Sequence, residues 1–190
     1  MSSSGSIAWV SLPAGPFVLR PPRESEAADA LAMLRDPDTH RWNPAPKVVD
    51  LETAADWCRR GADWSDGSHA TWSVVDTDER LVGNVSLWAL DRDDQRSGFV
   101  GYRTVPWARG RGVATQGLAA ATAWALGNLG LERLMLPHAV ANPASCVIAE
   151  RCGFTLEGVA RAGYRDPEGE RWDEHLHARL ATDPAPESNR

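Results

Sequence analysis

A glycine-rich turn flanked by arginines is the part of this sequence best suited to chemistry. It reads Arg109-Gly110-Arg111-Gly112-Val113-Ala114 and joins an expected strand, residues 97–105, to an alanine-rich expected helix, residues 113–126. The first backbone amides of a helix lack intrahelical partners and lie at the positive end of its dipole, so they bind anions. Glycines let a phosphate approach such a backbone closely. The turn therefore predicts a site for a pyrophosphate-bearing cofactor.

The spacing of this turn argues against two commoner phosphate sites. Arg-x-x-Gly-x-Ala has one glycine too few for the dinucleotide-binding fingerprint. It also lacks the Gly-Lys-Ser/Thr of the loops that bind nucleoside triphosphates. Nucleotide hydrolysis is therefore not expected.

Length and charge limit the classes of protein to which the chain can belong. The chain has 190 residues, 43% of them hydrophobic and 24% charged, which suits one core and is short for two. We expect a single domain over residues 1–181, with a loose or edge-pairing segment at 1–16 and a disordered tail at 182–190. The net charge of −6 argues against a nucleic-acid partner, because such proteins need an excess of Lys and Arg.

The cysteines and the apolar segments predict the cellular compartment of the protein. The three cysteines form no Cys-x-x-Cys pair and show no metal-ligand spacing with the five histidines, so neither disulfides nor a metal site are expected. No segment is suited to span a membrane, and none resembles a signal peptide. We therefore expect a cytoplasmic protein with no membrane partner.

Hydrophobic periodicity predicts the elements that must position the turn. Helices are expected over residues 24–35, 51–64, 113–126 and 143–151, and strands over residues 17–20, 71–76, 81–88, 97–105, 133–140, 155–161 and 171–180. Loops are expected at residues 40–44 and 162–170. This order predicts an α/β or α+β domain of three layers, with a mixed, mostly antiparallel sheet and helices on both faces.

Several motifs together resemble one family. They are Gly83-Asn84-Val85-Ser86-Leu87, Gly101-Tyr102-Arg103 before the glycine turn, Asn142-x-x-Ser145, and Glu150-Arg151-Cys152-Gly153-Phe154. In this order they resemble the GNAT superfamily of acetyl-CoA-dependent N-acetyltransferases, in its RimJ/RimL-like branch. The resemblance covers residues 17–180. It implies a GNAT-like domain with splayed central strands, acetyl-CoA as the cofactor, a primary amine as the acceptor, and homodimers as in many relatives.

The resemblance also implies which residues hold the cofactor. The amides of residues 111–114 would bind the pyrophosphate, and backbone N–H groups near residues 103–105 would stabilise the oxyanion formed on attack. Asn142 would fix the pantetheine arm, or else only cap the next helix. The expected cofactor-binding residues are Arg103, Thr104, Val105, Arg109, Gly110, Arg111, Gly112, Val113, Ala114, Thr115, Asn142 and Ser145.

The proton donor expected from the resemblance is a serine. Many relatives carry a tyrosine donor where Ala149 stands, so Ser145 is the candidate that would protonate the departing thiolate. Its alternative role is a simple hydroxyl at a helix start. An acyl-enzyme on Cys146 is disfavoured, because no histidine partner is visible in the sequence and direct attack needs none.

The general base is not identified, because Phe99 stands where many relatives have glutamate. A remote carboxylate or His138 could act through water. Without a strong base the acceptor is expected to be an α-amine, which is roughly one-tenth neutral at pH 7, whereas a lysine amine is neutral about once in 2,500.

The acceptor is expected to approach from the side opposite the cofactor. The candidate pocket residues are Trp42, Trp72, Ser86, Trp88, His138 and Tyr164. Trp42 and Trp72 would form aromatic walls for a cation. Three functions stay open: acetylation of a protein or peptide α-amine, acetylation of a small amine such as an antibiotic, polyamine or amino-acid derivative, and acyl-CoA binding without catalysis.

Overall fold

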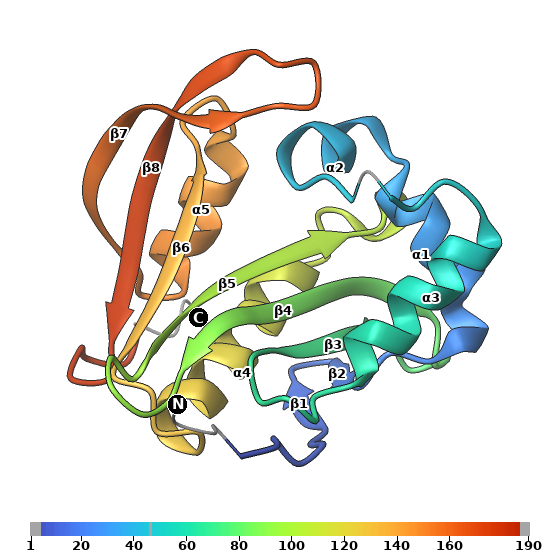
Figure 1. The fold of residues 1–190 in the computed structure, drawn as a ribbon, viewed down its shortest axis with the longest axis horizontal. Helices are drawn as coiled ribbons and strands as arrows, with labels where there is room; N and C mark the ends of the chain where they lie inside the picture. Colours follow the sequence, from blue (N-terminus) through green and yellow to red (C-terminus); the bar gives the residue numbers. More distant parts are fainter. Residues whose placement is uncertain (1–4, 46, 187–190) are drawn as a thin grey trace.

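A computed structural model describes residues 5–45 and 47–186 of the protein. Its centre is an eight-stranded sheet in the order β1-β2-β3-β4-β5-β6-β8-β7 (Figure 1). All neighbouring strands are antiparallel except β5 and β6, which run parallel. The strands are β1 (Leu12–Ala14), β2 (Phe17–Arg20), β3 (Ala70–Val75), β4 (Leu81–Asp91), β5 (Ser97–Thr104), β6 (Arg133–Ala139), β7 (Thr155–Arg165) and β8 (Arg171–Leu180).

Helices cover both faces of this sheet. On one side, the α4/α5 face, α4 (Val113–Gly127) packs on β4 and β5, and α5 (Pro143–Arg151) packs on β6 and β7 (Figure 1). The opposite side, the α1/α3 face, carries α1 (Ala27–Leu34) and α3 (Leu51–Ala62). The predicted mixed, mostly antiparallel three-layer domain is confirmed. Among the described residues, no helix is both long enough and apolar enough to cross a membrane.

Small residues let α4 lie close against the sheet. A Cβ atom added to Gly117 would lie 2.9 Å from Cγ2 of Val85, a separation that real carbon atoms avoid. The same helix face buries Leu118, Ala121 and Ala125 completely. This tight packing holds α4 against the strands β4 and β5 that precede the glycine turn.

Strands β5 and β6 pair only briefly. Their register joins Ser97 to Arg133, Gly98 to Leu134 and Phe99 to Met135, and no later pair is formed although both strands continue. Figure 1 shows the two strands separating from this point. The backbone edge of β5 beyond Phe99 is therefore not paired to β6.

The two ends of the described chain are more ordered than the sequence suggested. Of the two alternatives for the first residues, edge pairing holds, because β1 pairs with β2 and Ile7 is buried. At the other end, Asp183 accepts a hydrogen bond from the amide of Leu180 at 2.8 Å. Residues 1–4 and 187–190, which belonged to the expected loose segment and tail, lie outside the described residues.

Two expected loops are shorter than predicted. Most of the loop at residues 40–44 belongs to the helix α2 (Pro37–Trp42), which Asp36 caps by accepting from the amide of Thr39. An N-cap aspartate followed by proline is a common helix start, and here it begins α2 directly after α1 ends. The closing hairpin is longer too, because β7 continues to Arg165 through a register shift after Ala160.

Three tryptophans form part of the core. Trp72 packs edge-on against Trp64 at 4.9 Å and Trp124 at 5.2 Å between ring centroids. Its indole N–H donates to the carbonyl of Val10 at 3.0 Å, which ties the N-terminal segment to the sheet. Trp72 has no exposed surface, so its predicted role as a pocket wall is wrong. It is a core residue, as a large apolar ring with one satisfied donor often is.

Replacing Trp72 should therefore destabilise the fold. We expect Trp72→Ala to lower the free energy of unfolding by about 3–5 kcal/mol, because it leaves a large cavity. Urea unfolding followed by circular dichroism measures the change. Trp107→Ala is the matched control, because Trp107 is 40% exposed and its ring lies against the Arg80 guanidinium. This variant should lower the free energy of unfolding by about 1 kcal/mol or less. Equal losses in both variants would contradict the core assignment.

Candidate functional site

The glycine turn presents open backbone donors at the start of α4. Gly110 and Gly112 have φ angles of 75° and 80°, which L-residues with side chains rarely adopt. A Cβ atom at either position would meet nothing within 4 Å, so both face open space. Gly112 is the N-cap of α4, and in the described chain no side chain bonds the first helical amides. The turn has the form of an anion cradle.

The two arginines of the turn are held by carboxylates. Arg109 pairs with Asp36 and, at 3.1 Å, with Asp38, so it joins the turn to the start of α2. The exposed Arg111 lies 3.9 Å from Asp76 and stacks over the Phe17 ring at 5.9 Å. Arg109 is therefore a link between two elements as well as a charge near the expected phosphates.

The edge of β5 offers different amides from those expected. The amide of Val105 donates to the carbonyl of Val82 at 3.1 Å, which corrects its assignment as a free donor. In the antiparallel register Arg103 lies opposite Asn84, so its amide also points toward β4. By alternation, the amides of Tyr102 and Thr104 point toward the unpaired side, where β6 has diverged.

The Arg103 side chain fastens the end of α2 to β5. It donates to the side-chain oxygen of Asn43 at 2.7 Å, to the carbonyl of Asn43 at 3.0 Å and to Asn84 at 3.2 Å. Asn43 in turn donates to the carbonyl of Tyr102 at 3.0 Å. Burial lowers the pKa of Arg103 to about 10, so it stays charged at neutral pH. The sequence suggested backbone roles for this residue and did not indicate these side-chain hydrogen bonds.

Ser145 and Tyr102 place two hydroxyls between α5 and β5. Asn142 donates from its side chain to the Ser145 hydroxyl at 3.0 Å, and its carbonyl accepts from the Ser145 amide at 3.1 Å. Burial raises the pKa of Tyr102 to about 12, and the nearby Ser145 opposes that rise. The Tyr102 hydroxyl is buried and has no partner of hydrogen-bond geometry in residues 5–45 and 47–186. The sequence indicated Tyr102 only as part of the Gly101-Tyr102-Arg103 motif.

His138 lies on the α4/α5 face, together with groups that the sequence did not connect. Side chains alternate along strands, so His138 and Phe99 are on opposite faces, and the assignment of His138 to the acceptor pocket is corrected. Cys146 does have a histidine neighbour, since its Sγ lies 3.7 Å from Nε2 of His177. Burial nevertheless raises the pKa of the Cys146 thiol, which disfavours a nucleophilic thiolate.

Aromatic residues gather where α2 meets the β7–β8 hairpin. Trp42 packs against Trp172 at 5.8 Å and Tyr164 at 6.1 Å between ring centroids. The Arg41 guanidinium lies over both indoles, at 4.8 and 5.1 Å, and the Tyr164 hydroxyl donates to the Arg41 carbonyl. We call Arg41, Trp42, Tyr164 and Trp172 the aromatic rim. Trp42 and Tyr164 were expected near the acceptor, whereas Trp172 was not.

Two other predicted acceptor residues lie on the α1/α3 face. Trp88, 41% exposed, stacks on Phe99 with ring centroids 5.8 Å apart. Ser86 lines a cavity of about 270 Å³, whose other lining residues are Trp57, Arg60, Gly61, His69, Thr71 and Arg103. The position that holds glutamate in many relatives is thus filled by an aromatic stack.

Glu174 is a carboxylate that the sequence did not indicate, and it lies on the same face of the sheet as Phe99. The register relates Phe99 to Met135, and Ala139 on the same strand to Glu174, so these side chains share one face. Burial raises the pKa of Glu174 above its ordinary value. Its charge is close enough to Tyr164 to help raise the pKa of that phenol, mainly raised by burial, to about 12. Nothing in the local sequence around Glu174 signals this placement.

Comparison with known proteins agrees with this geometry. The model of the acetyltransferase (GNAT) domain matches residues 17–155. The chain is 30% identical over 148 residues to the putative ribosomal N-acetyltransferase YdaF of Bacillus subtilis, covering 75% of this chain and 78% of the relative. It is 32% identical over 85 residues to the probable N-acetyltransferase YjcK of the same species. This match covers 45% of this chain and 47% of the relative, so it spans about half of that relative's length.

A solved structure shows the same fold. The RimJ protein of Mycobacterium smegmatis, in complex with CoA-disulfide, superposes with a TM-score of 0.76 at 23% identity, covering 95% of this chain and 90% of that chain. The open amides, the diverging strands and the matched domain all indicate the same family. The chain belongs to the GNAT family of acetyl-CoA-dependent acetyltransferases.

Proposed function

We propose that this enzyme acetylates the α-amine of a protein or peptide. The observation that carries the proposal is the Phe99–Trp88 stack at the position where many GNAT enzymes have a basic glutamate. An acceptor that is already partly neutral needs less help with its proton, and an α-amine has a pKa of about 8. One relative is described as a putative ribosomal N-acetyltransferase, which supports a protein amine as the acceptor.

The α4/α5 side would bind the acetyl donor. The amides at the start of α4 would hold the pyrophosphate of acetyl-CoA, and Gly110 and Gly112 would let it approach. The amides of Tyr102 and Thr104 would receive the thioester carbonyl and stabilise the negative charge that develops there. The hydroxyls of Ser145 and Tyr102 would donate to the sulfur as it leaves. The donor supplies a thioester, whose thiolate leaves readily.

The α1/α3 side would receive the acceptor. The aromatic rim and the exposed Trp88 provide apolar surface for the acceptor, and Trp88, which Arg41 does not cover, adds cation–π surface for a protonated amine. The hydrogen bonds between Arg103 and Asn43 hold Trp42 at this rim. These contacts support a chain end or a small amine equally, so acetylation of a small-molecule amine is the alternative that the assay must separate.

Glu174 would act as the general base, directly or through water. It lies on the same face as Phe99, and burial raises its pKa, which makes the carboxylate a better proton acceptor than an exposed glutamate. An α-amine is still about nine-tenths protonated at pH 7, so even this acceptor has a proton that Glu174 would take.

We also propose that the protein works in a reducing, cytoplasmic compartment, as a monomer or a homodimer. The free thiols of Cys58, Cys146 and Cys152 support such a compartment.

A side chain at the cradle should weaken binding of the donor. We expect Gly112→Ala to raise the Kd of acetyl-CoA at least about tenfold, because its methyl group occupies the approach of the phosphates. Isothermal titration calorimetry measures the affinity. Gly130→Ala is the control, since Gly130 has a similar φ of 76° in another turn and carries the same backbone strain. Equal weakening in both variants would refute the cradle.

The acceptor class is tested with paired peptides. We expect release of the CoA thiol with a peptide that has a free N-terminus and no lysine, and little release with an N-terminally blocked peptide that has lysine. The rate should rise from pH 6 to about pH 8 as the α-amine loses its proton. Mass spectrometry locates the acetyl group. Acetylation mainly on lysine would overturn the proposal, and turnover only with spermidine or other small amines would support the alternative.

Removing the carboxylate of Glu174 should slow the reaction without affecting donor binding. We expect Glu174→Gln to lower kcat/KM for the α-amine peptide at least about tenfold near pH 7. The loss should shrink toward pH 9, where the amine is neutral without a base. Glu168→Gln, which removes an exposed carboxylate of the same hairpin, is the control. Wild-type kinetics in Glu174→Gln would exclude it as the base.

A further inference from the structure

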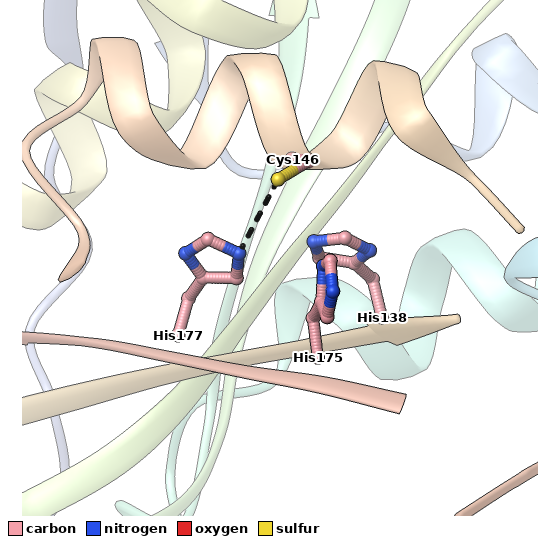
Figure 2. A group of neighbouring side chains, drawn as sticks. All are labelled: His138, Cys146, His175 and His177. Carbon is pink, nitrogen blue, oxygen red and sulfur yellow. Dashed lines mark hydrogen bonds between the residues drawn. The ribbon is translucent and has the colours of Figure 1, made fainter. Parts of the chain in front are cut away.

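Four potential metal ligands from three elements meet on the α4/α5 face. His138 lies on β6, His175 and His177 lie on β8, and Cys146 points down from α5 onto them (Figure 2). One ligand atom from each side chain lies within 4.8 Å of all the others. We propose that this His₃Cys cluster binds one transition-metal ion of the zinc class. The proposal goes beyond acetyl transfer and does not depend on it.

The sheet itself brings the three histidines together. His175 and His177 are two residues apart on one strand, so both side chains point to the same face. His138 is the cross-strand partner of His175, so it points to that face too. The ring centroids are 5.1 to 5.7 Å apart. The backbone thus groups the rings before any ion binds.

His138 already has the hydrogen bond that is typical of a metal ligand. Its Nδ1 lies 2.9 Å from the carbonyl oxygen of Ala139. A carbonyl only accepts, so Nδ1 must carry the hydrogen and Nε2 keeps its lone pair. This Nε2 is buried and has no partner among the described residues. Metal-bound histidines commonly donate their other N–H to a backbone carbonyl in this way.

The other ligands also have unused capacity. Nδ1 of His175 and Nδ1 of His177 are buried and without a hydrogen-bond partner in the part of the chain that is described. His138 and His177 keep only 8% and 1% of their surface exposed, so solvent offers little compensation. Buried polar atoms normally have partners, and orphaned ones call for an explanation. A bound cation would use the Nε2 lone pair of His138, which no other described residue uses, and the Nε2 of His177 that faces Cys146 (Figure 2).

The charge state of the cluster suits a cation. Burial lowers the pKa values of His138 and His177, which favours the neutral imidazole that a metal ion needs. Cys146 is the ligand that must lose a proton, and the proton would pass to solvent as the metal–sulfur bond forms. Glu150, whose Oε1 lies 3.5 Å from the Cys146 sulfur, adds negative charge at the exposed side.

Ligand number and type indicate zinc with a structural role. Zn²⁺ binds imidazole nitrogen at about 2.0–2.1 Å and thiolate at about 2.3 Å in a tetrahedron, so its ligand atoms lie roughly 3.4–3.6 Å apart. The cluster would contract by roughly 1 Å, which small side-chain rotations supply. Four protein ligands leave no open position. The ion would therefore clamp α5 onto β6 and β8, along the wall of the gap that faces β5.

Cobalt substitution tests the site. Chelator-treated full-length protein is titrated with Co²⁺ and then with Zn²⁺. We expect one Co²⁺ per chain, visible bands of tetrahedral intensity, a thiolate-to-cobalt charge-transfer band, displacement by Zn²⁺ and a higher thermal midpoint with either ion. Weak octahedral bands without charge transfer, or binding far below one ion per chain, would overturn the proposal from the wild-type protein alone.

Variants assign the ligands. Cys146→Ser should abolish the charge-transfer band, and His175→Ala should weaken Zn²⁺ binding at least about a hundredfold. Both residues are only partly buried, and circular dichroism checks that the variants fold. Cys58→Ser and His69→Ala, which change the same residue types outside the cluster, should bind as the wild type does. Unchanged Zn²⁺ affinity in the Cys146→Ser/His175→Ala double variant would also overturn the proposal.

Discussion

The separation of β5 from β6 is the constraint on which the rest of the molecule depends. A strand that loses its neighbour exposes backbone donors and acceptors, which are costly to leave unmatched. Here the pairing stops after Phe99 and Met135, while β5 continues to Thr104 and leads into the glycine turn. The unpaired strand edge and the open start of α4 therefore lie next to each other in the chain. A ligand with an extended amide arm and a pyrophosphate can satisfy both.

The sheet divides the chemistry between its two faces. Tyr102, Ser145 and the histidine cluster lie on the α4/α5 face, where α4 begins. Trp88, Phe99 and Glu174 lie on the α1/α3 face. The gap between the diverging strands is where a donor on one face can meet an acceptor from the other. Arg103 and Asn43 hold α2 at that gap by hydrogen bonds, so the aromatic rim is fixed by the strand that borders it.

The replacement of a carboxylate by Phe99 changes what the site needs from its acceptor. An aromatic stack cannot take a proton, so either the amine arrives neutral or another group accepts its proton. Glu174 reaches the same face from a different strand, with a pKa that burial raises. On the opposite face, three buried imidazole nitrogens lack hydrogen-bond partners within residues 5–45 and 47–186, and Cys146 lies next to these rings. Both arrangements use β8, so this strand contributes functional side chains on both faces of the sheet.

The sequence alone determined the local features of this protein. Gly112 with its helix start, the small-residue face of α4 and the bounds of α5 follow from short-range rules, and they are present in the structure. The motifs around Arg109, Asn142 and Gly153 sufficed for the family. Only the tertiary structure decided that Trp72 is a core residue, that α2 lies at the aromatic rim, and that the Val105 amide is already hydrogen-bonded. It also brought together His138, Cys146, His175 and His177, and it placed Glu174 on the face of Phe99. These relations depend on strand register between segments far apart in the chain, and hydrophobic periodicity predicts which residues form strands but not which strands become neighbours.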